Sequence, residues 1–179
     1  VPRGDSLSGA FNILRRVIAE QKQAKGLTEN LKIHLEEALE RKSLSAHVNQ
    51  MAAQQGTAKK TGHLAIALFR RSEEGERYAI RLEPLLKGEM TWVMRDVLGV
   101  LKKPVDTLPK FVAAIEERQE YILRQLMALL GQVADSRKDS LKDKSAEAED
   151  DGRKALPIED LLTDLKDDLE KYVRDQKRL

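Results

Sequence analysis

Residues 108–133 carry the most constraining pattern in the chain, an apolar seam that repeats every three or four residues. The steps alternate four and three without a fault through Leu108, Val112, Ile115, Gln119, Ile122, Leu126, Leu129 and Val133. This spacing places all eight side chains on one stripe of an α-helix, so it predicts a long amphipathic helix of the coiled-coil type. Gln119 is the polar position of the seam, and it should either meet a hydrogen-bond donor or mark a point where the packing opens.

Further apolar residues on this helix favour a bundle over a two-stranded coiled coil. Phe111, Leu123 and Leu130 widen the stripe beyond a single seam. A second stripe with the same spacing follows Pro157 and consists of Ile158, Leu162, Leu165, Leu169 and Tyr172. An isolated helix of that length is not stable in water, so we expect the second stripe to dock on the bundle or on a partner. The long seam is then filled partly from its own chain.

The composition agrees with a mainly α-helical protein. Charged residues make up 35% of the chain and aromatic residues only 4%, which suits exposed helices around an aliphatic core. The absence of cysteine excludes disulfides, zinc-thiolate sites and thiol chemistry. Because no signal peptide is recognisable either, we expect a cytoplasmic protein. No apolar stretch approaches the roughly 18 residues that a membrane helix needs, and a net charge of +2 does not indicate a polyanionic partner.

Breaks in the pattern divide the chain into four parts. Residues 1–5 resemble the remnant of a cleaved thrombin-site linker. Residues 6–134 are expected to form the bundle core. Residues 135–156 mix charges of both signs with few apolar residues, which predicts a helix extension that passes into a charged flexible linker. Residues 157–179 form the C-terminal amphipathic helix.

The N-terminal half shows three helical stretches, over 7–25, 28–42 and 44–54. The first has a stripe made of Leu7, Phe11, Leu14, Ile18 and Gln21, and Gly26 is a plausible stop. A break near Ser43 separates the second stretch from the third. Residues 54–62 have two glycines and no periodicity, which predicts a loop.

Residues 64–82 are ambiguous between a β-hairpin and a helix. An unbroken apolar run at 64–69 and the alternation of Tyr78, Ile80 and Leu82 with Arg77, Ala79 and Arg81 indicate two strands. The intervening segment around Gly75 suits a hairpin turn. The rival interpretation is one helix with Leu64, Leu68, Tyr78, Leu82 and Leu85 on a seam. Gly costs about 1 kcal/mol in a helix interior, which favours the hairpin.

The segment after the hairpin is predicted to contain one more helix. Pro84 and Gly88 should break the chain before it, and Pro104 should end it. Met90, Met94, Val97 and Leu101 define its apolar side. Trp92, lying between the two methionines, suits a core position better than an exposed binding surface.

No catalytic, metal or nucleotide signature stands out. His34 and Glu37 lie one turn apart, but a single reversed pair is best explained as a surface contact. Ser45 and His47 would point to different faces of a helix, and no acid orients them. Residues 56–62 contain glycine and lysine without the order of a phosphate loop. We therefore expect no enzyme activity, no cofactor, no metal and no small-molecule substrate.

The sequence favours a non-enzymatic module for protein–protein interaction or oligomerisation, acting through the two amphipathic seams. The alternative is a winged-helix regulator that binds DNA and dimerises through its long C-terminal helix, with 64–82 as the wing. Its nucleic-acid contacts would be Ser45, His47, Asn49, Gln50, Lys59, Lys60, Arg70, Arg71, Arg77 and Arg81. Several glutamates dilute the charge of that wing, and the helix-turn-helix spacing fits poorly.

Overall fold

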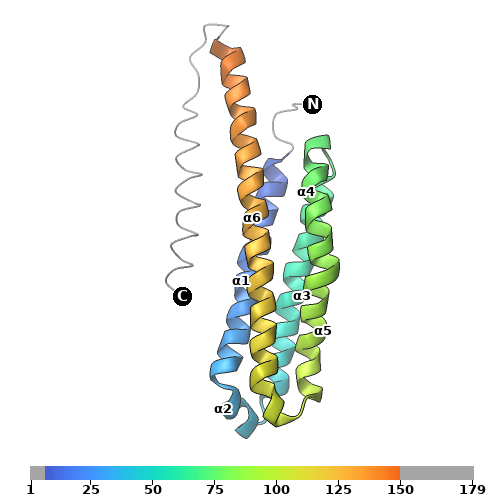
Figure 1. The fold of residues 1–179 in the computed structure, drawn as a ribbon, viewed down its shortest axis with the longest axis vertical. Helices are drawn as coiled ribbons and strands as arrows, with labels where there is room; N and C mark the ends of the chain where they lie inside the picture. The colour runs from blue at the N-terminus through green and yellow to red at the C-terminus, as the bar shows by residue number, and fades with distance from the viewer. Residues whose placement is uncertain (1–6, 150–179) are drawn as a thin grey trace. The chain divides into compact units, whose positions relative to one another are not determined.

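Helices account for almost all of residues 7–149, which are the residues that the computed structural model describes (Figure 1). The α-helices are α1 (Ser8–Ile33), α2 (Leu35–Glu40), α3 (Leu44–Phe69), α4 (Glu73–Pro84), α5 (Thr91–Gly99) and α6 (Leu108–Glu149). A π-helical segment, η1 (Leu85–Met90), joins α4 to α5, and the 3₁₀ turns η2 (Val100–Lys102) and η3 (Val105–Thr107) lead into α6. The prediction of a mainly α-helical protein is confirmed.

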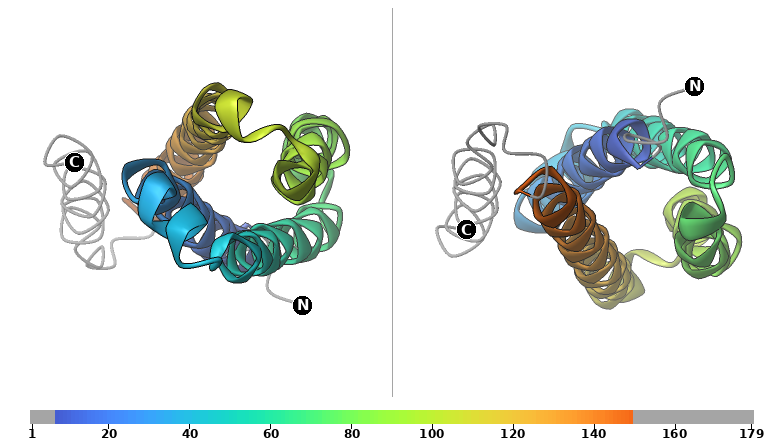
Figure 2. Two further views of the ribbon diagram at one scale, coloured as in Figure 1. Left: turned by 90° about the horizontal axis from the view of Figure 1, so that it is seen from below. Right: turned by 90° about the horizontal axis from the view of Figure 1, so that it is seen from above.

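The chain divides into two compact units, Val1–Leu130 and Gly131–Leu179, and α6 runs through the boundary between them. Within the first unit, four rods run antiparallel: α1, α3, the α4–α5 rod (73–99) and the first part of α6 (108–130). Seen along the rods, α3 lies between α1 and the α4–α5 rod, and α6 lies beside α1 (Figure 2). Short connections force neighbouring rods to be antiparallel, because the chain has no length in which to cross the bundle. We call this unit the bundle.

The core of the bundle is built from one buried stripe on each rod. Its largest fully buried side chains are Phe69, Leu14, Ile18, Leu31, Met51, Leu82, Leu86, Met90, Leu108, Ile115, Ile122 and Leu123. Each such side chain contributes roughly 1.5–3 kcal/mol through the apolar surface that it removes from water. The stripe predicted for residues 7–21 is buried on α1 from Leu7 to Gln21.

The predicted β-hairpin at 64–82 is wrong, because both of its strands belong to helices and residues 7–149 contain no strand. The apolar run 64–69 is the last part of α3. A turn at 70–72 follows, so the rival single helix is interrupted as well. Ser72 is the N-cap of α4 and accepts a hydrogen bond from the backbone N–H of Gly75 at 3.0 Å. Glu73 and Glu74 follow in the first turn, where the helix dipole favours negative charge.

The glycine that suggested a hairpin turn has a packing role instead. Gly75 is buried in the first turn of α4, and a Cβ atom there would overlap the backbone carbonyl of Phe69. Only glycine therefore allows α4 to begin so close to the end of α3. With 64–82 divided between α3 and α4, the alternative winged-helix architecture loses the wing that it requires.

The predicted loop at 54–62 and the predicted breaks at Gly26, Pro84 and Gly88 are also wrong. Residues 54–62 lie inside α3, and a Cβ on Gly62 would overlap the side chain of Leu86, so this glycine lets α3 approach η1 closely. Gly26 lies in the interior of α1. Pro84 ends α4 but the helical path continues through η1, where the Thr91 hydroxyl donates to the carbonyl of Leu86 at 2.9 Å.

Three predicted segments lie wholly or partly outside the described residues. The linker-like residues 1–5 and the C-terminal segment 157–179 with its stripe are among the residues that the structure does not describe. Of the charged segment 135–156, residues 135–149 belong to α6 and the rest is not described.

The predicted break near Ser43 is confirmed and has a defined geometry. Lys42 has a positive φ of 54°. The N–H of Ser43 donates to the carbonyl of Ala38 at 2.9 Å, and the N–H of Lys42 donates to the carbonyl of Leu39 at 3.2 Å. These two bonds form a Schellman motif, in which the left-handed position is usually occupied by glycine.

We expect Lys42→Gly to raise the free energy of unfolding by about 0.5–1 kcal/mol, because it removes the strain of a side chain in the left-handed region. The same change at the exposed Lys60, inside α3, should instead lower it by about 1 kcal/mol. Urea unfolding followed by circular dichroism measures both, and equal effects at the two sites would contradict the proposed strain.

Two glycine substitutions should have opposite effects on stability. Gly75→Ala should cost about 2–3 kcal/mol because its methyl group meets backbone that cannot move aside. Gly26→Ala should stabilise the chain by up to about 1 kcal/mol, since the site is exposed and no atom outside its own stretch of α1 lies within 4 Å of the added carbon. Thermal unfolding of both variants checks the prediction, which a stable Gly75→Ala protein would overturn.

Candidate functional site

Three buried glutamines meet in the core of the bundle, and we call them the glutamine layer: Gln21 of α1, Gln55 of α3 and Gln119 of α6. All three side chains are fully buried. Gln21 and Gln55 form a reciprocal amide pair, with Nε2 of Gln21 donating to Oε1 of Gln55 at 3.1 Å and the reverse bond at 2.6 Å. Nε2 of Gln119 also donates to Oε1 of Gln55, at 3.2 Å.

The glutamine layer fixes how three rods sit against one another. Because α3 and α6 are not neighbours around the bundle, the bond between Gln55 and Gln119 crosses its centre (Figure 2). Sliding one rod by a turn would move an amide by about 5.4 Å and leave it buried without a partner. Such an unpaired group costs roughly 1–3 kcal/mol, so the layer selects one register.

The sequence predicts that Gln119 meets a hydrogen-bond donor or marks an opening in the packing, and no donor to Gln119 is found among the described residues. Its nitrogen finds an acceptor, but Oε1 is buried and has no hydrogen-bond partner among the described residues. Gln21 was part of a predicted stripe. Gln55 fell in the predicted loop, and the signal that could have placed it was its spacing of four from Met51 and three from Ala58, both of which are buried on α3.

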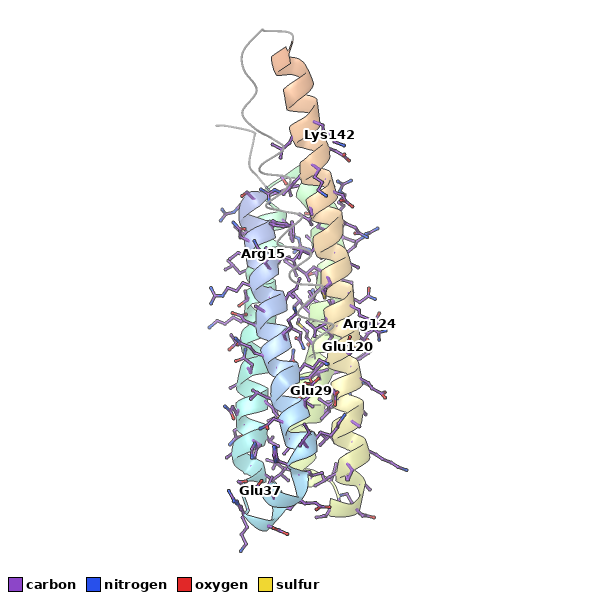
Figure 3. All side chains as sticks on the ribbon, turned by 90° about the vertical axis from the view of Figure 1, so that its left-hand side faces the viewer. Arg15, Glu29, Glu37, Glu120, Arg124 and Lys142 are labelled. Atoms are coloured by element: carbon purple, nitrogen blue, oxygen red, sulfur yellow. The ribbon has the colours of Figure 1, made fainter. Side chains whose placement is uncertain are left out.

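Ion pairs flank the glutamine layer where α1 meets α6. Nζ of Lys25 lies 2.5 Å from Glu29 of its own helix and 3.3 Å from Glu120 of α6, and Figure 3 shows both carboxylates at this seam. Lys32 lies 2.6 Å from Glu116. Burial lowers the pKa of Lys25, but hydrogen bonds and charge from Glu29 and Glu120 outweigh it, so the pKa is raised overall. A raised lysine pKa stabilises the fold at neutral pH, and this contribution is lost only when alkaline pH deprotonates the folded group.

The structure places the predicted 108–133 seam inside one chain. All of its eight side chains, from Leu108 to Val133, are buried. The five stripe residues between Ile158 and Tyr172 lie outside the described residues. The seam of α6 is therefore already covered in a single copy of the chain.

The residues of the DNA-binding alternative lie on α3, in the turn that follows it and on α4. Ser45, Asn49, Gln50 and Lys60 are exposed on α3, whereas His47 and Lys59 are partly covered. Arg70 pairs with Glu83 at 2.9 Å and Arg77 stacks on Tyr78, with 4.9 Å from the guanidinium carbon to the ring centre. Arg71 and Arg81 are exposed at the end of α3 and on α4.

The histidines considered for metal binding or catalysis gather at one corner of the bundle. His34 and His47 line the same open depression between α1, α2 and α3. Nδ1 of His34 lies 3.5 Å from Glu37, and Glu37 also pairs with Arg41 at 2.9 Å. Among residues 7–149, no group of three or more His, Cys, Asp or Glu side chains comes together in a way that could hold a metal ion.

A surface that the sequence did not reveal lies where α5 faces α6. Trp92, expected in the core, is 44% exposed, although its neighbour Met90 is buried. The guanidinium carbon of Arg118 lies 5.6 Å from the centre of the Trp92 ring, and the guanidinium lies 3.7 Å from Asp96. Tyr121, one turn further along α6, is 43% exposed.

An open depression continues this surface toward the start of α6. It is lined by Lys103, Pro104, Thr107, Lys110, Phe111 and Ala114. Nζ of Lys103 lies 4.7 Å from the centre of the Phe111 ring, and the same ring packs beside Gly99. We call the strip formed by Trp92, Asp96, Phe111, Ala114, Arg118 and Tyr121, with its two lining lysines, the α5–α6 face.

Comparison with known proteins adds no relative, since no family model, curated protein or solved structure matches this chain. Within residues 7–149, no helix combines the length and the apolar character that crossing a bilayer demands.

Substitutions in the glutamine layer should have unequal effects. Gln119→Leu removes one hydrogen bond together with an unpartnered acceptor, so its unfolding free energy should stay within about 1 kcal/mol of wild type. Gln55→Leu leaves the amides of Gln21 and Gln119 without their partner and should cost about 2–4 kcal/mol. Urea unfolding of both variants tests this order, and a larger loss for Gln119→Leu would contradict it.

Proposed function

We propose that the chain is a non-enzymatic protein-interaction module that associates with a second copy of itself through the apolar stripe of residues 158–172. The observation that carries the proposal is that the 108–133 seam is buried within one chain. The sequence holds a second apolar stripe with four-three spacing at 158–172, and we assign the intermolecular seam to it. Amphipathic helices associate by burying such stripes, while outer charges select the orientation.

The bundle would serve this function as a rigid platform. Its glutamine layer and the ion pairs of Lys25 and Lys32 join three rods in one register, which favours a bundle that keeps its arrangement on binding. A partner surface that is already rigid keeps the entropic cost of association small.

We expect the full chain to form a concentration-dependent oligomer that Leu162→Asp reduces to monomer, because the new carboxylate falls on the apolar stripe. Thr163→Asp adds the same charge one position away, off the stripe, and should leave the oligomer intact. Light scattering after size-exclusion chromatography measures the mass. A wild-type chain that stays monomeric at every concentration, or equal effects of the two variants, would contradict the proposal.

A further inference from the structure

The α5–α6 face concentrates the kinds of side chain that dominate binding energy. The sequence contains seven aromatic residues, and three of them, Trp92, Phe111 and Tyr121, lie on this one face. Trp, Tyr and Arg are the residue types most often found at the energetic centres of protein interfaces. Trp92 and Tyr121 nevertheless keep more than two fifths of their surface exposed, and they are the two aromatic side chains among the exposed large hydrophobic residues of the described chain.

The spacing on α6 suits a partner helix. Phe111, Ala114, Arg118 and Tyr121 follow each other by three, four and three residues, so they form one stripe along the helix. Ten residues of helix span about 15 Å, which is nearly three turns. The small side chain of Ala114 lies between the larger ones and lines the open depression. A second helix laid along this stripe would bury its apolar anchors between Trp92 and Tyr121.

The charged residues on the face determine which side chains are favoured on either side of the apolar stripe of that partner helix. Lys103 and Lys110 line the depression, and Arg118 stands beside Trp92. The carboxylates near these cations in the sequence are Asp96, which is paired with Arg118, the partly covered Glu89, and the exposed Asp106 and Glu117. None of them lines the depression. Arg118 contacts Asp96 with one of its nitrogens at 3.7 Å, so donors of its planar fork are left for an incoming carboxylate.

We propose that the α5–α6 face binds an acidic amphipathic helix of a partner protein. Leucine-type anchors of that helix contact Trp92, Ala114 and Tyr121, and its flanking carboxylates meet Lys103, Lys110 and Arg118. A single-stranded nucleic acid would use the same rings for stacking, but it requires a continuous cationic groove. The interleaved Asp96 and Glu89 oppose a phosphate backbone, whereas a helix places its charges only along its edges. This surface uses other residues than the 158–172 stripe of the proposed function and extends that function to a second, heterologous partner.

Trp92 supplies an intrinsic probe, because it is the only tryptophan in the sequence. The full-length protein is titrated with a synthetic peptide of about four helical turns that has leucines at four-three spacing, glutamates on both flanks and no aromatic residue. We expect the emission of Trp92 to shift to shorter wavelength and its quenching by acrylamide to fall at least about twofold as the ring is covered. A peptide of the same composition with scrambled leucines should leave both signals unchanged.

Variants on the face locate the contact. Arg118→Glu should weaken binding at least about tenfold, and Tyr121→Ala about three- to tenfold. Lys60→Glu and Ile80→Ala make matched changes at exposed positions of α3 and α4 and should have no effect. Circular dichroism confirms that each variant is folded, and Lys110→Glu provides a second charge reversal that does not disturb the Trp92 stack.

Three results would overturn this inference. The first is no change of Trp92 emission at peptide concentrations up to about 1 mM. The second is equal binding of the scrambled peptide, which would show non-specific attraction. The third is tighter binding of oligothymidine than of the peptide, which would make the face a nucleic-acid site. Because Leu162→Asp leaves the α5–α6 face untouched, failure of the self-association test and failure of this titration are distinguishable.

Discussion

The side-chain amide of Gln55 is the constraint on which the register of the bundle depends. It exchanges two hydrogen bonds with Gln21 and accepts a third from Gln119, so it joins α1, α3 and α6 at one level of the core. Apolar stripes alone tolerate sliding, because leucine packs against leucine at many offsets. A buried amide does not, since each group that loses its partner costs about 1–3 kcal/mol. Burial of the apolar side chains contributes most of the stability, and the hydrogen bonds of the amides determine the register in which the rods pack.

The part of the fold that could be predicted is the part in which spacing alone determines the outcome. The four-three seam from Leu108 onward is a helix because eight consecutive positions agree, and all eight are buried. The β-hairpin predicted at 64–82 is wrong because, over so short a length, the same apolar pattern fits either two strands or a helix. Tyr78, Ala79 and Leu82 are buried on α4, while Ile80 is exposed, so the alternation of Tyr78, Ile80 and Leu82 does not mark one buried face. Ser72 followed by Glu73 and Glu74 is the feature of the sequence that indicates the start of α4.

The loop and the hairpin turn predicted at glycines are wrong for a related reason. A glycine lowers helix propensity, and sequence reasoning therefore ends or interrupts a helix at Gly62 or Gly75. Tertiary contacts decide otherwise, because close approach to Leu86 or to the Phe69 carbonyl admits no side chain. In the candidate sites, Gln119 and Gln21 could be found by stripe position. The α5–α6 face could not, since whether Trp92 points inward depends on the geometry of the preceding π segment.

That π segment resolves a mismatch of phase in the α4–α5 rod. Tyr78, Leu82, Leu86 and Met90 are all buried at steps of four residues, whereas Val93, Val97 and Val100 return to the usual three and four. In a regular α-helix, three successive steps of four would rotate the stripe by about 120° and carry its end out of the core. The wider turns of η1 absorb this excess, so one continuous rod keeps facing the centre. The same correction sets the angular position of every residue that follows, and Trp92 and Asp96 are turned toward α6 as its direct result.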